Sequence, residues 1–399
     1  MAELPPKVVS LLASEIYDIF GLRSVKDAFV KFNGKYGQHF DFKADYRDNL
    51  ITTRVGGPGI LKSKMAFGAH GFGKGLFEGH AFIVLRGTKT TPEMITNLNI
   101  GFSRAANKQS VHDGFNTAFK KGCQRYVNAV AKEARRRNIH SIHCIGHSLG
   151  GALATLAADY LSANYDMQPY LYTFGGPRTG TLGFAQELTR RLRPERIFRV
   201  YNRTDIVPCV PPFPYVHAPL GAGSVDYQIP GVGGVFPSSK WHGHTLYATS
   251  LEGSTWDSLR SHAEQRLSKN EIKRWLEKDS PIAFTISNVK ALDAVVNYVI
   301  QLSLKATGVS FAFGFGTGFT IFDWTARVAK EGLKLTGEVS YLVFRLIIRI
   351  MQILGMKPIA DKVEATEHFI RHIFILLHQR LMAYAQKAFD QAINKGRGL

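Results

Sequence analysis

Cysteine is scarce in this chain of 399 residues, which contains only Cys123, Cys144 and Cys209. An odd number cannot form a complete set of pairs, and Cys144 falls inside an apolar run that predicts a buried strand. We therefore expect no disulfide framework and folding in a reducing compartment.

The N-terminus lacks a basic segment followed by an apolar core. Residues 1–7 read MAELPPK, which is not typical of a secretory signal peptide. We therefore expect synthesis in the cytoplasm without a signal peptide, followed by membrane association or export through a specialised secretion system. The second route would make the protein a secreted effector.

Acidic residues are in deficit, with 31 Asp and Glu against 50 Lys and Arg, a formal charge of +19. Anionic lipid headgroups attract a basic surface by about 1 kcal/mol per nearby Lys or Arg. Nucleic acid would also attract it, but no nucleic-acid-binding motif is present, and Arg135–Arg137 suits the C-terminal end of a helix. We predict an anionic phospholipid partner and no nucleic acid; a generally basic solvated surface is the alternative.

Two apolar segments mark the C-terminal part of the chain. Ala306–Phe322 carries no charge, but its 17 residues fall short of the roughly 20 that span a bilayer as a helix. A re-entrant insertion and a buried core helix are both open. Val339–Leu354 places Arg345 and Arg349 on one face of a broadly apolar helix, for which membrane docking and packing in a helical bundle are both open.

A nucleophile signature lies in the first half of the chain. G-H-S-L-G at 146–150 follows the apolar run Ser141–Ile145 and precedes a segment rich in Ala and Leu that ends near Asn164. Ser148 thus lies on a predicted turn between a strand and a helix, where flanking glycines allow close approach. The Leu149 N–H at the helix start suits an oxyanion hole. A small-residue turn that only packs the helix on the strand is the alternative.

A serine hydroxyl needs a general base and an acidic group that orients the base, and in such a fold both follow the nucleophile in the chain. The strand-like run Arg196–Tyr201 leads into residues 202–208, which puts Asp205 at a strand end; it is the acid candidate, unless it is an ordinary turn aspartate. Three histidines follow it before residue 250: His217, His242 and His244. We select His244, which precedes an apolar helical segment, with His217 as the runner-up.

Several separated motifs resemble those of the class 3 lipases, the family that includes the fungal triacylglycerol lipases. They are V-L-R-G-T at 84–88, V-H-D-G-F at 111–115, T-F-G-G-P-R at 173–178 and N-R-T-D-I-V-P at 202–208. The resemblance extends over most of residues 60–250. It implies an α/β-hydrolase fold, Asp205 as the acid, and His244, followed by Thr245–Tyr247, as the family's late histidine. It also implies that Thr88 joins Leu149 in the oxyanion hole.

Members of this family carry a lid after the position that Thr88 occupies. Here Met94, Ile95, Leu98 and Phe102 have helix-like spacing. Such a segment can cover an apolar acyl cleft in water and open at a lipid surface. A fixed surface helix with the same face turned inward is the alternative.

The pattern changes near residue 255. Glycine-rich turns and alternating strands and helices before it predict an α/β fold, whereas the remainder lacks strand alternation. We predict an α/β-hydrolase domain over 1–255 and a helical, membrane-associating domain over 256–399.

These features together predict a lipolytic serine hydrolase that cleaves esters of membrane glycerolipids, as a phospholipase A does, through an acyl-enzyme on Ser148. No metal or cofactor is required. The alternatives are a triacylglycerol lipase, an esterase of soluble esters, and a membrane-perturbing or partner-binding protein with a vestigial hydrolase domain. An inhibitor or chaperone partner is left open.

Overall fold

The structure is a computed structural model. It describes residues 3–17, 37, 39–41, 50–55, 63–87, 101–221, 223–230, 234–236, 239–262, 267–308 and 320–394.

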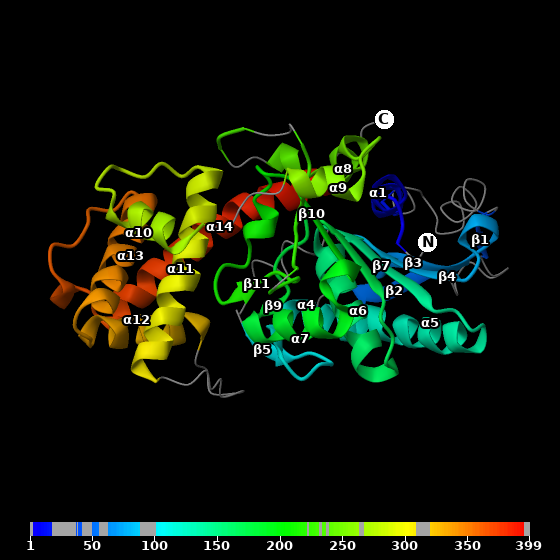
Figure 1. Ribbon diagram of the computed structural model, residues 1–399, viewed down its shortest axis with the longest axis horizontal. Helices are drawn as coiled ribbons and strands as arrows, with labels where there is room; N and C mark the ends of the chain where they lie inside the picture. The colour runs from blue at the N-terminus through cyan, green and yellow to red at the C-terminus, as the bar shows by residue number, and fades with distance from the viewer. Residues whose placement is uncertain are drawn as a thin grey trace.

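A mixed β-sheet forms the centre of the N-terminal part (Figure 1). Its order is β1-β3-β4-β7-β8-β10-β12, with β2 paired to β3. The strands are β1 (Phe40–Asp41), β2 (Leu50–Val55), β3 (Ser63–Gly73), β4 (His80–Leu85), β7 (Ser141–His147), β8 (Tyr170–Phe174), β10 (Ile197–Tyr201) and β12 (Tyr227–Gln228). The strands from β4 to β12 are parallel and the β1–β3, β2–β3 and β3–β4 pairs are antiparallel. The segments after β7 and β10 therefore leave the sheet at the same edge.

Alternate residues of the sheet enter two cores. Ile83 and Cys144 face one core, which includes α4 (Asp113–Ala118), α5 (Gln124–Arg136), α6 (Leu149–Tyr165) and α7 (Leu182–Leu192). Phe82 and Ile145 face the other, which includes α1 (Pro6–Glu15), α8 (His244–Ser250) and α9 (Trp256–Ser261). Helices thus cover both faces of the sheet, as its parallel strands require.

A second, small antiparallel sheet lies beside the first, in the order β11-β9-β6-β5. Its strands are β5 (Phe102–Arg104), β6 (Ser110–His112), β9 (Gly180–Thr181) and β11 (Tyr215–Val216). The chain has the predicted α/β-hydrolase fold, followed by a helical C-terminal region.

The C-terminal region is a bundle that lies to one side of the sheet (Figure 1). Its helices are α10 (Lys269–Glu277), α11 (Ile286–Thr307), α12 (Ile321–Lys334), α13 (Glu338–Leu354) and α14 (Glu367–Asn394). A domain boundary at residue 255 stays a prediction, since Trp256 and Leu259 pack in the same core as α1.

The basic face of α13 points inward. Arg345 Nε donates to the carbonyl of Leu276 at 2.9 Å, and Arg349 Nη1 donates to the carbonyls of Lys278 at 2.8 Å and Ser280 at 3.0 Å. Most apolar side chains of α13 are buried as well. Of the two alternatives for Val339–Leu354, the structure therefore has packing in a bundle.

The apolar segment Ala306–Phe322 lies mostly outside the described residues, because positions 309–319 are not among them. Among the helices that the structure does describe, none combines the length and apolar character needed to cross a membrane. The thiols of Cys123, Cys144 and Cys209 are buried and unpaired, which confirms that they form no disulfide framework.

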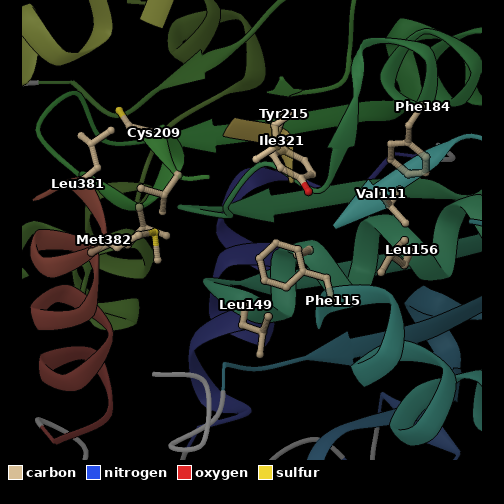
Figure 2. Close-up of a cluster of buried hydrophobic side chains, with 14 of the residues drawn as sticks. Val111, Phe115, Leu149, Leu156, Phe184, Cys209, Tyr215, Ile321, Leu381 and Met382 are labelled. Atoms are coloured by element: carbon tan, nitrogen blue, oxygen red, sulfur yellow. The ribbon is translucent and has the colours of Figure 1, made fainter. Parts of the chain in front are cut away.

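The helical region is joined to the hydrolase part by polar and apolar contacts. Arg178, in the turn after β8, donates two hydrogen bonds to Asp293 of α11, at 2.7 and 2.8 Å. Figure 2 shows Leu381 and Met382 of α14 beside Cys209, in the same buried cluster. Helix α14 also packs against the 3₁₀ turns Val207–Cys209 and Ser239–His242.

Two buried histidines lie on the two sides of this junction. Burial lowers the pKa of His112 to about 3, with a smaller effect from the nearby His378. Burial likewise lowers the pKa of His378, on α14, to about 4. Both imidazoles therefore stay neutral in the folded protein at pH values where they take up a proton in the unfolded chain.

The substitution His378→Leu tests this coupling between folding and pH. Below about pH 6.5 the unfolded state binds a proton that folded His378 does not. The free energy of unfolding therefore decreases as the pH is lowered, by about 1.4 kcal/mol per pH unit for each such histidine. The free energy of unfolding should be measured with denaturant between pH 6 and pH 4.5. Its dependence on pH should be shallower for His378→Leu than for wild type, corresponding to about one proton fewer bound on unfolding. The control is His368→Leu on the exposed face of the same helix; equal slopes for the two variants would contradict the assignment.

Candidate active site

Ser148 lies on a sharp turn between β7 and α6. Its backbone has φ 60° and ψ −133°, a strained combination for a residue with a side chain. A Cβ added to Gly146 would lie 2.1 Å from the carbonyl oxygen of Gly150, and one added to Gly150 would lie 2.1 Å from that of Leu85. The close approach of strand and helix therefore requires both glycines, which confirms that prediction.

Ser148 forms a hydrogen-bonded chain with His242 and Asp205. His242 Nε2 lies 2.9 Å from Ser148 Oγ, and His242 Nδ1 lies 2.7 Å from Asp205 Oδ2. All three side chains are buried. This order of serine, imidazole and carboxylate allows the imidazole to take the serine proton while the carboxylate stabilises the resulting charge.

Asp205 follows β10, as the alternating pattern predicts, and its carboxylate is held by several donors. The Val207 N–H donates to Oδ1 at 2.9 Å and the Tyr247 hydroxyl donates to Oδ2 at 2.8 Å. Gly175 has φ +56°, and a Cβ there would lie 2.7 Å from Asp205 Oδ2. A glycine at this position leaves room for the buried carboxylate.

The structure corrects the choice of His244 as the base. His244 is the first residue of α8, and its Nδ1 lies 2.8 Å from Ser14 Oγ, with its ring stacked on Tyr17 at a centroid distance of 4.3 Å. His242, which ends the preceding 3₁₀ turn, faces Ser148 instead. Local sequence gives no means of choosing between two histidines separated by one glycine. The runner-up, His217, is bound elsewhere: its Nε2 lies 2.7 Å from the Pro208 carbonyl oxygen.

A chain of hydrogen bonds connects α1 with the active site. The Gly87 N–H donates to the Tyr17 hydroxyl at 2.9 Å, and that hydroxyl lies 2.9 Å from His147 Nδ1. His147 Nε2 lies 2.9 Å from the carbonyl of His242 and donates to it. Neutral His147 then accepts at Nδ1 from Tyr17. Burial raises the pKa of Tyr17 to about 12 and holds that of His147 well below its usual range, so both groups keep these roles near neutral pH.

Sequence reasoning missed Tyr17, His147 and Tyr247 as parts of this site. Tyr17 precedes the nucleophile by more than a hundred residues, and no local pattern marks it. His147 lies inside the G-H-S-L-G motif, so its position was the one available signal.

The candidate oxyanion hole is described only in part. Leu149 is the first residue of α6 and is buried. Thr88 lies outside the described residues. Its neighbour Gly87 borders the nucleophile, since a Cβ added there would lie 3.3 Å from Ser148 Oγ. The end of β4 therefore lies close to the reacting hydroxyl.

The lid prediction falls largely outside the described residues, which do not include Met94, Ile95 or Leu98. Phe102 is among the described residues, and the prediction that it belongs to a lid helix is wrong. It begins β5, pairs with His112 of β6 and stacks on Tyr215 at a centroid distance of 5.3 Å. Phe102 is thus part of a packed strand rather than of an amphipathic helix.

Comparison with known proteins gives a consistent likeness. Residues 82–215 match the family model Lipase (class 3), so this segment is similar to the class 3 lipases. The chain is 36% identical over 154 residues to secreted mono- and diacylglycerol lipase 1 of Fusarium solani, covering 37% of this chain and 44% of that protein. It is 31% identical over 170 residues to phospholipase A1-II 2 of Oryza sativa subsp. indica, covering 33% of this chain and 41% of that protein. The match thus spans less than half the length of these two relatives.

Solved structures are similar as well. Lipase II from Rhizopus niveus matches with a TM-score of 0.40 and 24% identity, over 56% of this chain and 79% of that one.

The relatives also correct the expected location. The matching lipase of Fusarium solani is a secreted protein. This finding conflicts with an origin in the cytoplasm without a signal peptide, and the predictions of membrane association or specialised export as the protein's location are withdrawn with it.

Substitution of the two neighbouring histidines distinguishes their roles. His242→Ala removes the group within hydrogen-bond distance of Ser148 Oγ and should slow the inactivation of Ser148 by a fluorophosphonate by about 10²- to 10⁴-fold. His244→Ala is the matched control two residues away and should keep most of the rate. The opposite ranking would show that His244 is the base and that the observed pairing is wrong.

Tyr17→Phe tests the connection from α1. Loss of the hydroxyl leaves Gly87 N–H and His147 Nδ1 without this partner, and we expect about tenfold slower labelling by the same reagent, equivalent to about one hydrogen bond. The control is Ser14→Ala in the last turn of α1, three residues before Tyr17, which removes the contact to His244. Thermal unfolding should be measured for both variants. Equal labelling by Tyr17→Phe and wild type would exclude a positioning role.

Proposed function

We propose that this protein is a lipolytic serine hydrolase that cleaves carboxylic esters of glycerolipids. The observation that carries this proposal is the buried chain from Ser148 through His242 to Asp205. Its position at the carboxyl edge of a parallel sheet, on a strained turn between strand and helix, suits a serine nucleophile.

The reaction begins when Ser148 Oγ attacks the ester carbonyl. His242 Nε2 takes the hydroxyl proton as the new C–O bond forms, and Asp205 stabilises the imidazolium through Nδ1–H. The imidazolium then donates its proton to the leaving alcohol oxygen as that C–O bond breaks. Water, deprotonated by His242, cleaves the acyl-enzyme in the same way and restores Ser148.

The tetrahedral intermediate carries a negative oxygen that needs donors. The Leu149 N–H, at the N-terminus of the 17-residue helix α6, is one candidate, since such donors are unpaired and the helix dipole favours an anion there. Thr88 is the second candidate, from the family resemblance and from the position of its neighbour Gly87.

Substrate must reach a closed site. Ser148 is 2% exposed and His242 is 0% exposed, so a lipid ester contacts Ser148 only after covering segments move. Opening of this kind at a lipid surface exposes an apolar acyl site where the substrate itself replaces water.

Among glycerolipids, we propose acyl esters of phospholipids as the substrate. The charge of +19 favours anionic headgroups, and no nucleic-acid partner is proposed. One relative is named a phospholipase A1, which supports this choice. Another is named a mono- and diacylglycerol lipase, which supports neutral glycerides as the second candidate.

Fatty-acid release tests this proposal. Wild type and Ser148→Ala should be compared on phospholipid vesicles and on diacylglycerol and triacylglycerol emulsions. We expect release from vesicles that Ser148→Ala lowers by at least about 10³-fold. Release from emulsions alone would replace the phospholipid proposal by the neutral-lipid one. No release by wild type from any of them would reject lipolysis.

A further inference from the structure

Contact with a lipid surface requires apolar side chains that the protein leaves in water. The bundle buries most of the apolar side chains of α11, α12 and α13. The large hydrophobic side chains that are exposed among the described residues are Leu76, Leu182, Val235, Phe236, Tyr341 and Val363. Val235 and Phe236 are the adjacent pair, at 64% and 63% exposure.

This pair is attached to α11 and precedes the catalytic histidine by a short stretch of chain. The Val235 carbonyl accepts from the Ile286 N–H at 3.1 Å, which attaches the segment to the start of α11. Phe236 precedes His242 by six residues, so at most roughly 20 Å of extended chain separates them. Val235 and Phe236 therefore lie no farther from His242 than about the length of one lipid molecule.

A cation and an aromatic ring occupy the chain between the pair and His242. Lys240 is exposed, and its ammonium lies 4.3 Å from the ring centroid of the half-buried Trp241. The Trp241 carbonyl accepts from Asn202 Nδ2 at 3.4 Å, which places this turn beside the loop that carries Asp205. Tryptophan and lysine are among the side chains that occupy the headgroup level of a bilayer.

We propose that Val235, Phe236, Lys240 and Trp241 form a docking patch for a bilayer that contains anionic glycerophospholipid. Val235 and Phe236 enter the acyl boundary, Trp241 lies at the headgroup level, and Lys240 pairs with phosphate. The basic charge of the chain complements the same surface. This inference rests on the proposed function only for the identity of the lipid. It gives the patch the role of bringing the buried site to its substrate.

Binding is measured separately from catalysis, with Ser148→Ala as the parent protein. Co-sedimentation is performed with phosphatidylcholine vesicles, with and without phosphatidylglycerol. We expect the parent to prefer the anionic vesicles and the added substitutions Val235→Ser and Phe236→Ser to weaken binding about tenfold or more. Lys240→Glu should remove most of the preference for phosphatidylglycerol.

Exposed apolar residues elsewhere supply matched controls. Leu76→Ser and Val363→Ser remove side chains that are 86% and 79% exposed and should leave vesicle binding as in the parent. Binding by the Val235→Ser and Phe236→Ser protein equal to that of these controls would overturn the patch. An equal loss of vesicle binding in the patch variants and in the controls would overturn it too, because any exposed apolar residue would then contribute to binding as much as the patch does.

The effect of the patch on turnover is measured by comparing two substrates. In proteins with Ser148 intact, the rate on vesicles divided by the rate on a soluble short-chain ester should fall about tenfold in the Val235→Ser and Phe236→Ser protein. An unchanged ratio would contradict a role in substrate access. Vesicle binding by the parent in the absence of any wild-type turnover would reject the proposed function while leaving the docking patch in place, so the two proposals fail separately.

Discussion

The buried carboxylate of Asp205 is the constraint on which the rest of the site depends. A charge without solvent is tolerated only when donors surround it, and here they come from His242, Tyr247 and the Val207 backbone. These donors belong to a 3₁₀ turn, to α8 and to the segment after β10. Satisfying one carboxylate therefore fixes three segments relative to one another, and the position of His242 Nε2 beside Ser148 follows.

Segments from the two ends of the chain converge on this arrangement. From the N-terminal side, Tyr17 contacts Gly87 and His147, and His147 holds the backbone of His242. From the C-terminal side, α14 packs on the turns that follow Asp205 and precede Gly243. The bundle thus supports the loops of the site, and the apolar character of its helices is explained by burial. Apolar contact with lipid is left to Val235 and Phe236, near His242.

The basic residues of the chain have two different roles, depending on whether they are buried or exposed. Arginines of α13 satisfy carbonyls at the end of α10 and beyond it, so part of the basic excess stabilises the bundle. Lys240 remains exposed beside the catalytic turn. A count of basic residues cannot separate these two uses, because both contribute equally to net charge.

The sequence by itself determined the features that depend on local geometry. Ser148 and its glycines are recognisable because a strand, a tight turn and a helix must meet within a few residues, and Asp205 because an alternating strand ends just before it. Tertiary structure decided what depends on distant segments: His242 rather than His244, the hydroxyl of Tyr17, and the inward face of α13. Two histidines one glycine apart have nearly the same local pattern. Only the packing of α1 against α8, which holds His244 at Ser14, leaves His242 to face the nucleophile.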